Sequence, residues 1–590
     1  MKYKLYNENN IELSVLPQIL SNRGIKDYQK WLNASKEDIN SPFAFGVEIV
    51  NKAVEMLRQA VLHKKKICVI VDADADGFTS AAIIINYLYK LYSWNLSDEE
   101  CREKITYILH SDKQHGLNDC YQKIADDVQL VITPDSSTND IEEMKYLIDK
   151  NKQILTLDHH ESDDWIHNEN AVIINNQICD YPNKDLSGAG VTWQICRAYD
   201  NIMGLNFANK YIDLAALGIL SDMMNFCSIE TKAIIDIGLQ QIHNPFFYYM
   251  VEKNQFSINK MGGVNYMSIA FYVTPFINAI VRSGTSEEKD LIFKSMLQMY
   301  AFQRIESGKR GHKGELVPRV EEAVRICTNV KARQTKLQDS AMALLEQKIH
   351  DQQLTKNSII VLLCEPGDIE KNLTGLCANK IQAKYQRPCY ILIKSKKQDD
   401  KEYYYRGSGR NYSMSENQDL RQLVLSTNLP EFVQGHANAH GLGIAESRIK
   451  DFIKATNDLY QNISQEPVYW VDFIWNINDI NPLDILKIAD SKELWGQGVP
   501  EPYIVLEDIP VNDNNVRLLS ADKNPTLKIH LDNCGIDIMK FKSSQEEYEK
   551  FIEPNTLLTL VGRANKNEWM GRVTPQIIIE DYELRQEWIF

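Results

Sequence analysis

Apolar residues in the first third of the chain form short continuous runs that alternate with helical stretches. The runs KICVIV at 66–71 and QILTL at 153–157 are almost entirely apolar, whereas 47–62 places apolar residues at helical spacing. Strands that are apolar throughout and alternate with helices are typical of a parallel sheet covered on both faces. We therefore predict a parallel α/β domain. Further strands are expected at 104–109, 128–133 and 171–174, with helices at 78–91, 119–125 and 141–150.

The pattern changes three times further along the chain. From about 236 it is helical, apart from an irregular segment, TPFINAIVRSGT. Strands and helices alternate again from about 357, and the glycine-rich stretch GHANAHGLGI follows. After 465, short strands separated by turns are typical of an all-β barrel. The sequence predicts four parts: a first α/β domain (1–235), connecting helices (236–350), a smaller α/β domain (351–460) and a β barrel (466–590).

Composition narrows the class of protein. A chain of 590 residues is too long for one core. Its net charge of −15 argues against coating nucleic acid by bulk charge, but not against a local basic channel. Basic groups such as Lys309-Arg310 with Lys313 are expected to be solvated surface. The eleven cysteines form no C-x-x-C pair, and we see no signal peptide or apolar run of ~18 residues. We expect a cytoplasmic monomer with reduced thiols and no membrane span.

Acidic residues and histidines follow three of the predicted strands. VDADADG ends the first strand, PDSS follows the strand at 128–133, and LDHH ends the strand at 153–157. Ligands of an open α/β sheet bind outside the carboxyl ends of its strands, so these groups share one edge. We expect a later aspartate, in GILSD, to fold back to that edge. These motifs contain Asp72, Asp74, Asp76, Asp135, Asp158, His159, His160 and Asp222.

Clustered carboxylates repel one another, and burying them costs several kcal/mol unless a cation joins them. A set of four carboxylates and one imidazole suits manganese or magnesium. Two such ions ~3.5–4 Å apart hydrolyse phosphate diesters well. Taken singly, DADADG can be a calcium loop, Asp135 a helix N-cap and His160 a core histidine. Taken together, the motifs predict a two-metal phosphoesterase. The four carboxylates and the imidazole predicted to bind the metal ions are Asp74, Asp76, Asp135, His159 and Asp222.

The order of DADADG, PDSS, LDHH and GILSD resembles the four-motif signature of the DHH phosphoesterase superfamily. Within it, the chain looks like the RecJ single-strand-specific exonucleases. The segments that also resemble this family are NRGI, SGAGVTWQ, PFINAIVR, GSGR, GHANAHGLGI, WGQGVPEP and NEWMGRVTPQIIIED. The resemblance implies a DHH domain and a DHH-associated domain around a cleft, followed by a C-terminal all-β OB-fold barrel.

The resemblance also implies a role for each motif residue. The implied metal ligands are Asp74, Asp76, Asp135, His159 and Asp222, with Asp72 and Asp158 as adjoining carboxylates that orient ligands or hold the second metal. His160 would approach the scissile phosphate, and Arg282 would lie near the same phosphate, whose paired oxygens suit a guanidinium. We group Asp72 with the metal ligands and Asp158 with the catalytic residues.

Other matched positions concern the substrate. Ser408, Arg410 and His436 match residues that line the cleft where the family holds the 5′ end. In YILHSDKQHGLN, His110 stands at the family's arginine position and His115 at its tyrosine position. A neutral histidine anchors a 5′-phosphate more weakly than arginine, so the strictness of 5′-end selection stays open. PDSS also lacks the glycine that follows this aspartate in the family. In the barrel, Tyr503, Trp569 and Arg572 are candidates for contacting the strand.

We therefore predict an exonuclease that degrades single-stranded DNA from 5′ to 3′, releasing 5′-mononucleotides with two manganese or magnesium ions, in DNA repair or recombination. A single-strand-binding protein or a helicase is a candidate partner. Two alternatives remain: a phosphodiesterase acting on short oligonucleotides or cyclic dinucleotides, and an inactive single-strand-binding scaffold. Action on RNA as well as DNA is also open.

Overall fold

The computed structural model describes residues 1–7, 14–110, 114–396, 402–464, 466–520 and 523–587. Contacts divide the chain into two compact units. The first unit contains Arg23–Gln334 and Lys492–Pro500, and the second contains Met1–Asn22, Thr335–Ser491 and Glu501–Phe590. The predicted four-part division stays a prediction. Residues 111–113 of YILHSDKQHGLN and the last three residues of the predicted barrel lie outside the described ranges. Within those ranges, no helix has both the length and the apolarity needed to cross a membrane.

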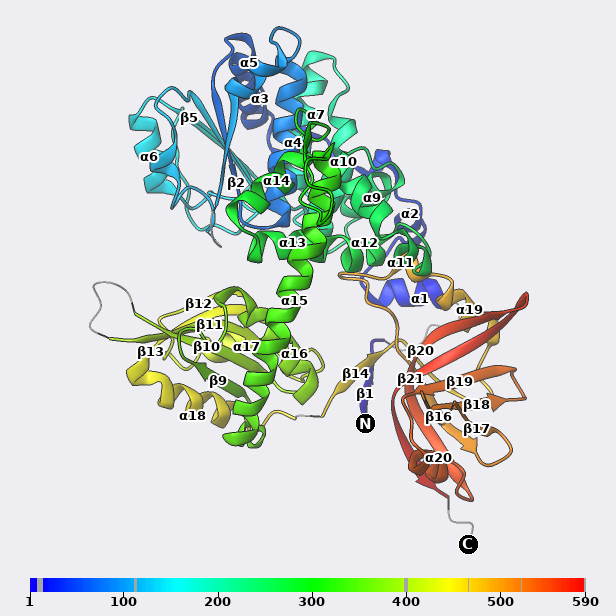
Figure 1. Ribbon diagram of the computed structural model, residues 1–590. Coiled ribbons are helices and arrows are strands. Elements are labelled where there is room, and N and C mark those ends of the chain that lie inside the picture. The colour runs from blue at the N-terminus through cyan, green and yellow to red at the C-terminus, as the bar shows by residue number, and fades with distance from the viewer. Residues whose placement is uncertain (8–13, 111–113, 397–401, 465, 521–522, 588–590) are drawn as a thin grey trace. The chain divides into compact units, whose positions relative to one another are not determined.

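The predicted parallel sheet lies in the first unit (Figure 1). Its strand order is β3-β2-β4-β5-β6, and every neighbouring pair is parallel. The strands are β2 (Ile67–Val71), β3 (Ile105–Leu109), β4 (Leu130–Pro134), β5 (Gln153–Asp158) and β6 (Ala171–Asn175). Helices α3 (Val47–Leu62), α4 (Ala75–Tyr92) and α7 (Gly188–Met203) cover one face, and α6 (Ile141–Asp149) covers the other. The predicted α/β class is confirmed, and all five strands end at one edge.

Two segments of the first unit differ from the sequence prediction. The stretch 119–125 forms only a short 3-10 turn, Tyr121–Lys123, although Cys120 and Ile124 still pack against the sheet. The segment expected to be irregular forms α13 (Thr274–Ser283), because Pro275 stands in the first turn, where it interrupts no helical hydrogen bond. The other helices of this region are α8 (Ile212–Ser221), α9 (Ile229–Gln240), α10 (Pro245–Lys253), α11 (Gln255–Lys260), α12 (Tyr266–Tyr272) and α14 (Ser286–Met296).

The second unit contains a mixed five-stranded sheet in the order β12-β13-β11-β10-β9. Only β9 and β10 pair in parallel. The strands are β9 (Ile360–Cys364), β10 (Cys389–Ser395), β11 (Tyr404–Arg410), β12 (Phe432–His436) and β13 (Ala439–Ala445). Helix α16 (Thr374–Tyr385) packs on β10 and β11, and the 33-residue α15 (Arg319–Asp351) contributes residues to both units. The smaller α/β fold is therefore present.

A seven-stranded sheet forms where the barrel was predicted, in the order β15-β16-β20-β21-β19-β18-β17. Two short helices, α19 (Pro482–Ala489) and α20 (Gln545–Phe551), accompany it, so the region is not purely β. The strands are β15 (Phe473–Asn476), β16 (Ile504–Val511), β17 (Val516–Leu519), β18 (Thr526–Leu531), β19 (Ile536–Phe541), β20 (Thr556–Trp569) and β21 (Arg572–Gln586). The sequence prediction missed β1 (Lys2–Leu5), which pairs in parallel with β14 (Val468–Val471).

A buried glutamate fixes α7 against α9 in the first unit. Glu230 in α9 is 1% exposed and accepts hydrogen bonds from the side chains of Asn40, Tyr181, Asn183 and Gln194 at 2.7–3.0 Å. Gln194 lies in α7, whose first turn reaches the edge of the sheet where the acidic motifs end. A buried carboxylate is stabilising only while such donors compensate its lost hydration.

We predict that Glu230→Ala lowers the free energy of unfolding of the first unit by about 3 kcal/mol, because it leaves several buried donors without an acceptor. Urea unfolding followed by fluorescence measures this. Glu252→Ala, at an exposed position in α10, is the matched control and should change stability by about 0.5 kcal/mol or less. Equal effects of the two substitutions would contradict this role for Glu230.

Candidate metal centre

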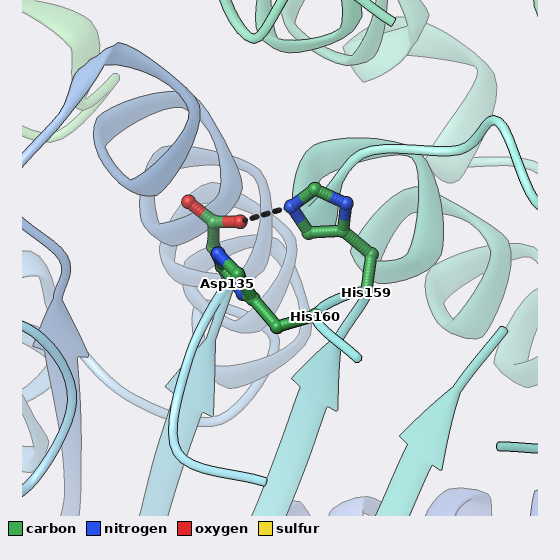
Figure 2. Close-up of side chains that lie close together, drawn as sticks. All are labelled: Asp135, His159 and His160. Carbon is green, nitrogen blue, oxygen red and sulfur yellow. Dashed lines mark ion pairs between the residues drawn. The ribbon is translucent and has the colours of Figure 1, made fainter. Parts of the chain in front are cut away.

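The acidic motifs converge at the carboxyl edge of the parallel sheet. Three groups of potential ligand atoms each lie within 4.8 Å of one another: Asp72 with Asp74 and Asp135, Asp76 with His159 and Asp222, and Asp135 with His159 and His160. Asp135 follows β4 and His159 follows β5. Asp135 Oδ1 lies 3.2 Å from His159 Nε2, an ion pair that Figure 2 marks with a dashed line. Asp135 and His159 each belong to two groups. The structure thus brings together all six side chains that were predicted as metal ligands.

Asp135 is a buried carboxylate with few polar partners among the described residues, of which the imidazole of His159 lies 3.2 Å from its Oδ1. Its side chain is buried, and within the described residues neither of its oxygens accepts a hydrogen bond. Burial, followed by the charges of Asp76 and Asp74, raises the pKa of Asp135 well above its usual range. Its φ of +65° lies in the left-handed region, as does that of Ser137 at +78°. A non-glycine residue adopts this conformation at a cost, which aspartate and asparagine bear more readily than most.

Asp76 is oriented by the start of α7. Its Oδ1 accepts hydrogen bonds from Ser187 Oγ at 2.8 Å and from the Ala189 backbone N–H at 3.3 Å. Its Oδ2 is buried and accepts none within the described part of the chain. Burial, with a contribution from the nearby charge of Asp74, raises the pKa of Asp76 to about 6. One oxygen is therefore fixed and the other is left for a ligand.

The first two aspartates of DADADG are held by backbone and histidine contacts. Asp74 is the N-cap of α4, and its Oδ1 accepts a hydrogen bond from the Gly77 N–H at 2.8 Å. Asp72 contacts His115 Nδ1 at 2.7 Å and accepts from the Gly116 N–H at 3.0 Å. Burial raises the pKa of Asp72, while the hydrogen bond from His115 works in the opposite direction. His115, noted only as a departure from the family, therefore touches the acidic cluster.

Asp158 contacts both His159 and His160 through its carboxylate. Its Oδ1 accepts hydrogen bonds from the His159 N–H and lies 2.8 Å from His160 Nδ1, while its Oδ2 accepts from the Thr138 N–H and hydroxyl. Asp158 belongs to none of the three ligand groups found among the described residues. Burial opposes ionisation, but the bond to His160 holds the pKa of Asp158 below its usual range. Asp158 is thus placed to orient His160.

Two supporting residues were missed by the sequence analysis. Asn175, at the end of β6, donates hydrogen bonds to Thr138 Oγ1 at 3.0 Å and to the His160 carbonyl at 2.9 Å. Thr138 in turn binds Asp158, so the three residues form one buried chain of hydrogen bonds. No sequence pattern marked Thr138. The position of Asn175 at a strand end was the only available signal.

The donor set fits a divalent cation. Burial, followed by the charges of Asp76 and Asp74, raises the pKa of Asp222 well above its usual range, as it does for Asp135. These carboxylates are therefore poorly stabilised as anions by the protein alone. Buried carboxylate oxygens without donors, together with one imidazole, suit manganese or magnesium better than a structural zinc site.

Arg282 and His110, two residues of the first unit predicted as phosphate contacts, differ in the positive charge that they can offer. Arg282 lies in α13, where burial lowers its pKa and the charge of Asp74 works in the opposite direction. It is therefore within electrostatic reach of the acidic cluster. His110 is only 5% exposed, and burial lowers its pKa. His110 accordingly offers no permanent positive charge to a phosphate.

Ser408, Arg410 and His436 belong to the second unit. Arg410 and His436 both pair with Ala439 of β13, so they lie on strands either side of it. Ser408 Oγ is 2.9 Å from Thr374 Oγ1, at the start of α16. A Cβ atom on Gly375 would lie 2.7 Å from Arg410 Nη2, so the guanidinium packs against the first turn of α16. The hydroxyl and the guanidinium thus lie beside the first turn of α16.

The two aromatic residues of the predicted barrel that are candidates for contacting a nucleic-acid strand differ in their exposure. Tyr503 accepts a hydrogen bond from Arg563 at 2.7 Å, and its ring packs edge-on against Tyr469. Trp569 is 69% exposed, at the end of β20. Of these two rings, Trp569 is the one that is open to a base.

Comparison with known proteins supports these assignments of fold. Residues 66–219 match the DHH family N-terminal domain, and residues 471–581 match the RecJ OB domain. The chain is 31% identical to "Putative SPbeta prophage-derived single-strand DNA-specific exonuclease YorK" of Bacillus subtilis strain 168, over 99% of this chain and 98% of that protein. It is 25% identical to "Single-stranded-DNA-specific exonuclease RecJ" of the same strain, over 95% of this chain and 66% of that protein.

Solved structures agree with the fold. RecJ from Thermus thermophilus in complex with Mn²⁺ superposes with a TM-score of 0.69 at 19% identity, covering 98% of this chain and 79% of that one. Its complex with Mg²⁺ gives a TM-score of 0.62. The acidic edge of the parallel sheet and the match at 66–219 define the class as a DHH protein. Because the similarity to YorK extends over nearly the full chain and the OB domain also matches, the chain belongs to the RecJ-like family of DHH proteins.

Glycines of the covering helices permit the close approach of the acidic residues. A Cβ atom on Gly188, at the start of α7, would lie 2.4 Å from Asp135 Oδ1 and 2.6 Å from its Cα. A Cβ atom on Gly218 of α8 would lie 2.2 Å from Asp76 Oδ1. By contrast, a Cβ atom on Gly190 would approach apolar side-chain atoms: Leu186 Cδ2 at 3.1 Å, Leu186 Cβ at 3.4 Å and Ile219 Cδ1 at 3.6 Å.

We predict that Gly188→Ala weakens Mn²⁺ binding by about 10–100-fold, because Asp135 must shift. Isothermal titration calorimetry measures the affinity, and circular dichroism checks that the fold is retained. Gly190→Ala, two residues along the same helix, is the control and should bind Mn²⁺ almost as wild type. Equal affinities of the two variants would show that Asp135 is not a ligand.

Proposed function

We propose that this chain is a metal-dependent exonuclease that degrades single-stranded DNA from the 5′ end and releases 5′-mononucleotides. The observation that carries the proposal is Asp135, a buried carboxylate without a hydrogen-bond donor among the described residues, at the centre of a carboxylate–histidine cluster. The names of the relatives support single-stranded DNA as the substrate. Two divalent ions, manganese or magnesium, are the proposed cofactors, in keeping with the Mn²⁺ and Mg²⁺ complexes of Thermus RecJ.

The proposed ligands are Asp72, Asp74, Asp76, Asp135, His159 and Asp222. When bound, the ions would activate a water molecule and neutralise charge on the phosphate. His160 is held through Nδ1 by Asp158, so Nε2 is the nitrogen available to the substrate. The imidazole is half exposed, and although partial desolvation opposes its protonation, the bond to Asp158 raises the pKa of His160 to about 9. A protonated His160, with Arg282, would supply positive charge to the scissile phosphate.

The second unit would hold the 5′ end. Ser408 and Arg410, beside the start of α16, form a cradle suited to a terminal phosphate, and His436 is exposed nearby on β12. His110, being buried, is not part of this anchor in our proposal. A role in DNA repair or recombination, and contact with a single-strand-binding protein or a helicase, stay predictions from the family resemblance.

A digestion time course with Mn²⁺ tests the proposal. Single strands carrying a label at the 5′ or the 3′ end are compared with a matched blunt duplex. We expect mononucleotide to be released at once from the 5′ label, while the duplex remains intact. Hydrolysis of di- to pentanucleotides without cleavage of long strands would instead favour the small-substrate phosphodiesterase. Binding of strands without any hydrolysis would favour the inactive scaffold.

The central carboxylate provides a sharper test. We predict that Asp135→Asn reduces the rate of hydrolysis with Mn²⁺ by at least about 100-fold. In the metal-free protein, the same substitution should raise the free energy of unfolding by on the order of 1 kcal/mol, which corresponds to a rise of a few degrees in the thermal midpoint. Both effects follow from replacing a proposed metal ligand, a buried carboxylate that accepts no hydrogen bond among the described residues and lies close to like charges. Asp163→Asn, at an exposed position, is the matched control and should change neither quantity. Destabilisation together with retained activity would mean that Asp135 is structural.

A further inference from the structure

A short hairpin in the first unit interrupts the helical region and was not expected from the sequence. Strands β7 (Arg304–Glu306) and β8 (Leu316–Pro318) pair in antiparallel fashion. At its base, the Arg319 N–H donates to the Gln303 carbonyl at 2.9 Å. The chain is therefore already closed below the hairpin, and connecting α14 to α15 does not require the loop between the two strands.

The loop at the end of this hairpin consists of two successive glycine-dependent turns. The His312 N–H donates to the Lys309 carbonyl at 3.0 Å, and the Glu315 N–H donates to the His312 carbonyl at 3.1 Å. The third residue of each turn is a glycine with positive φ, +87° at Gly311 and +84° at Gly314. This is the arrangement of a type II turn, which requires glycine at that position. The second residue of each turn, its outer corner, is basic: Arg310 in one and Lys313 in the other.

The three cations of this loop are exposed and have no partner within the described residues. Lys309, Arg310 and Lys313 form no ion pair, side-chain hydrogen bond or cation–π contact there. Other charged groups at the hairpin are engaged. Arg325 pairs with Glu322, which also accepts from the Gly308 N–H, and His312 Nδ1 lies 2.8 Å from Glu315. The loop itself thus carries three cations without a partner among the described residues and one carboxylate, Glu315, which lies beside His312.

We propose that this basic loop, residues 307–315, binds the phosphate backbone of the nucleic-acid strand, as a contact separate from the metal centre. The inference rests on the proposed function, since it assumes a nucleic-acid substrate. In a protein of net charge −15, three adjacent unpaired cations on ordered turns are complementary to a polyanion. The expected role is to hold a long strand between successive cleavages, and very short substrates should not need it.

The test measures binding of a 40-nucleotide single strand by fluorescence anisotropy, in EDTA so that no hydrolysis occurs, over a range of KCl concentrations. The variant combines Lys309→Gln, Arg310→Gln and Lys313→Gln. The control variant combines Lys52→Gln, Lys145→Gln and Lys550→Gln, which removes the same charge from exposed helix positions that form ion pairs with neighbouring glutamates. In a second variant, an Asn-Gly turn replaces residues 305–317. The hydrogen bond between Arg319 and Gln303 lies outside the replaced segment and can still close the chain.

The loop variant should bind about tenfold more weakly at ~0.1 M salt, and its slope of log K against log[KCl] should be shallower by about 2, as expected for three lost phosphate contacts. Its hydrolysis of a trinucleotide with Mn²⁺ should stay within about twofold of wild type. An unchanged slope, or an equal change in the control variant, would overturn the proposal. If wild type hydrolyses nothing, the proposed function fails, but the comparison of slopes still decides the role of the loop.

Discussion

The mutual repulsion of buried carboxylates at the edge of the parallel sheet is the constraint around which the first unit is built. Asp76 and Asp135 are buried and Asp222 is partly buried, and all three have raised pKa values because of desolvation and the like charges beside them. Nothing in the described residues donates a hydrogen bond to either oxygen of Asp135. Such an arrangement is costly in the absence of a cation. A bound divalent cation would offset this cost, which is the physical reason for proposing a metal centre here.

The surrounding structure maintains this strained arrangement in two ways. Helices α7 and α8 present glycines at Gly188 and Gly218, where any side chain would collide with Asp135 or Asp76. Behind β5, the chain from Asn175 through Thr138 to Asp158 fixes the histidine pair by hydrogen bonds. Oriented ligands lose less entropy on binding a metal, and a fixed partner sets the tautomer of a histidine. Packing and hydrogen bonding thus place the donors before any ion arrives.

Periodicity located the candidate ligands because each lies at or just after the end of an apolar strand or helix. It was insufficient for Thr138 and Ser187, which act through hydrogen bonds that no spacing rule marks. The hairpin of β7 and β8 was not predicted within the helical region. Its strands have only three residues each, too few to show the alternation of apolar and polar residues that identifies a strand. The parallel pairing of β1 with β14 joins residues more than 450 positions apart, and no local pattern predicts such contacts. His110 was assigned to the substrate by position alone, whereas its burial depends on the tertiary fold.

The most direct test of this account is the number and coupling of Mn²⁺ ions bound by the intact chain, measured by electron paramagnetic resonance during a titration. Two ions held by one carboxylate cluster, ~3.5–4 Å apart, should be magnetically coupled. We predict that the six-line signal of free Mn²⁺ stays absent until about two equivalents have been added, and that a broad coupled spectrum develops instead. Free Mn²⁺ appearing from the first addition, or isolated uncoupled ions at saturation, would contradict a two-metal centre at this edge of the sheet.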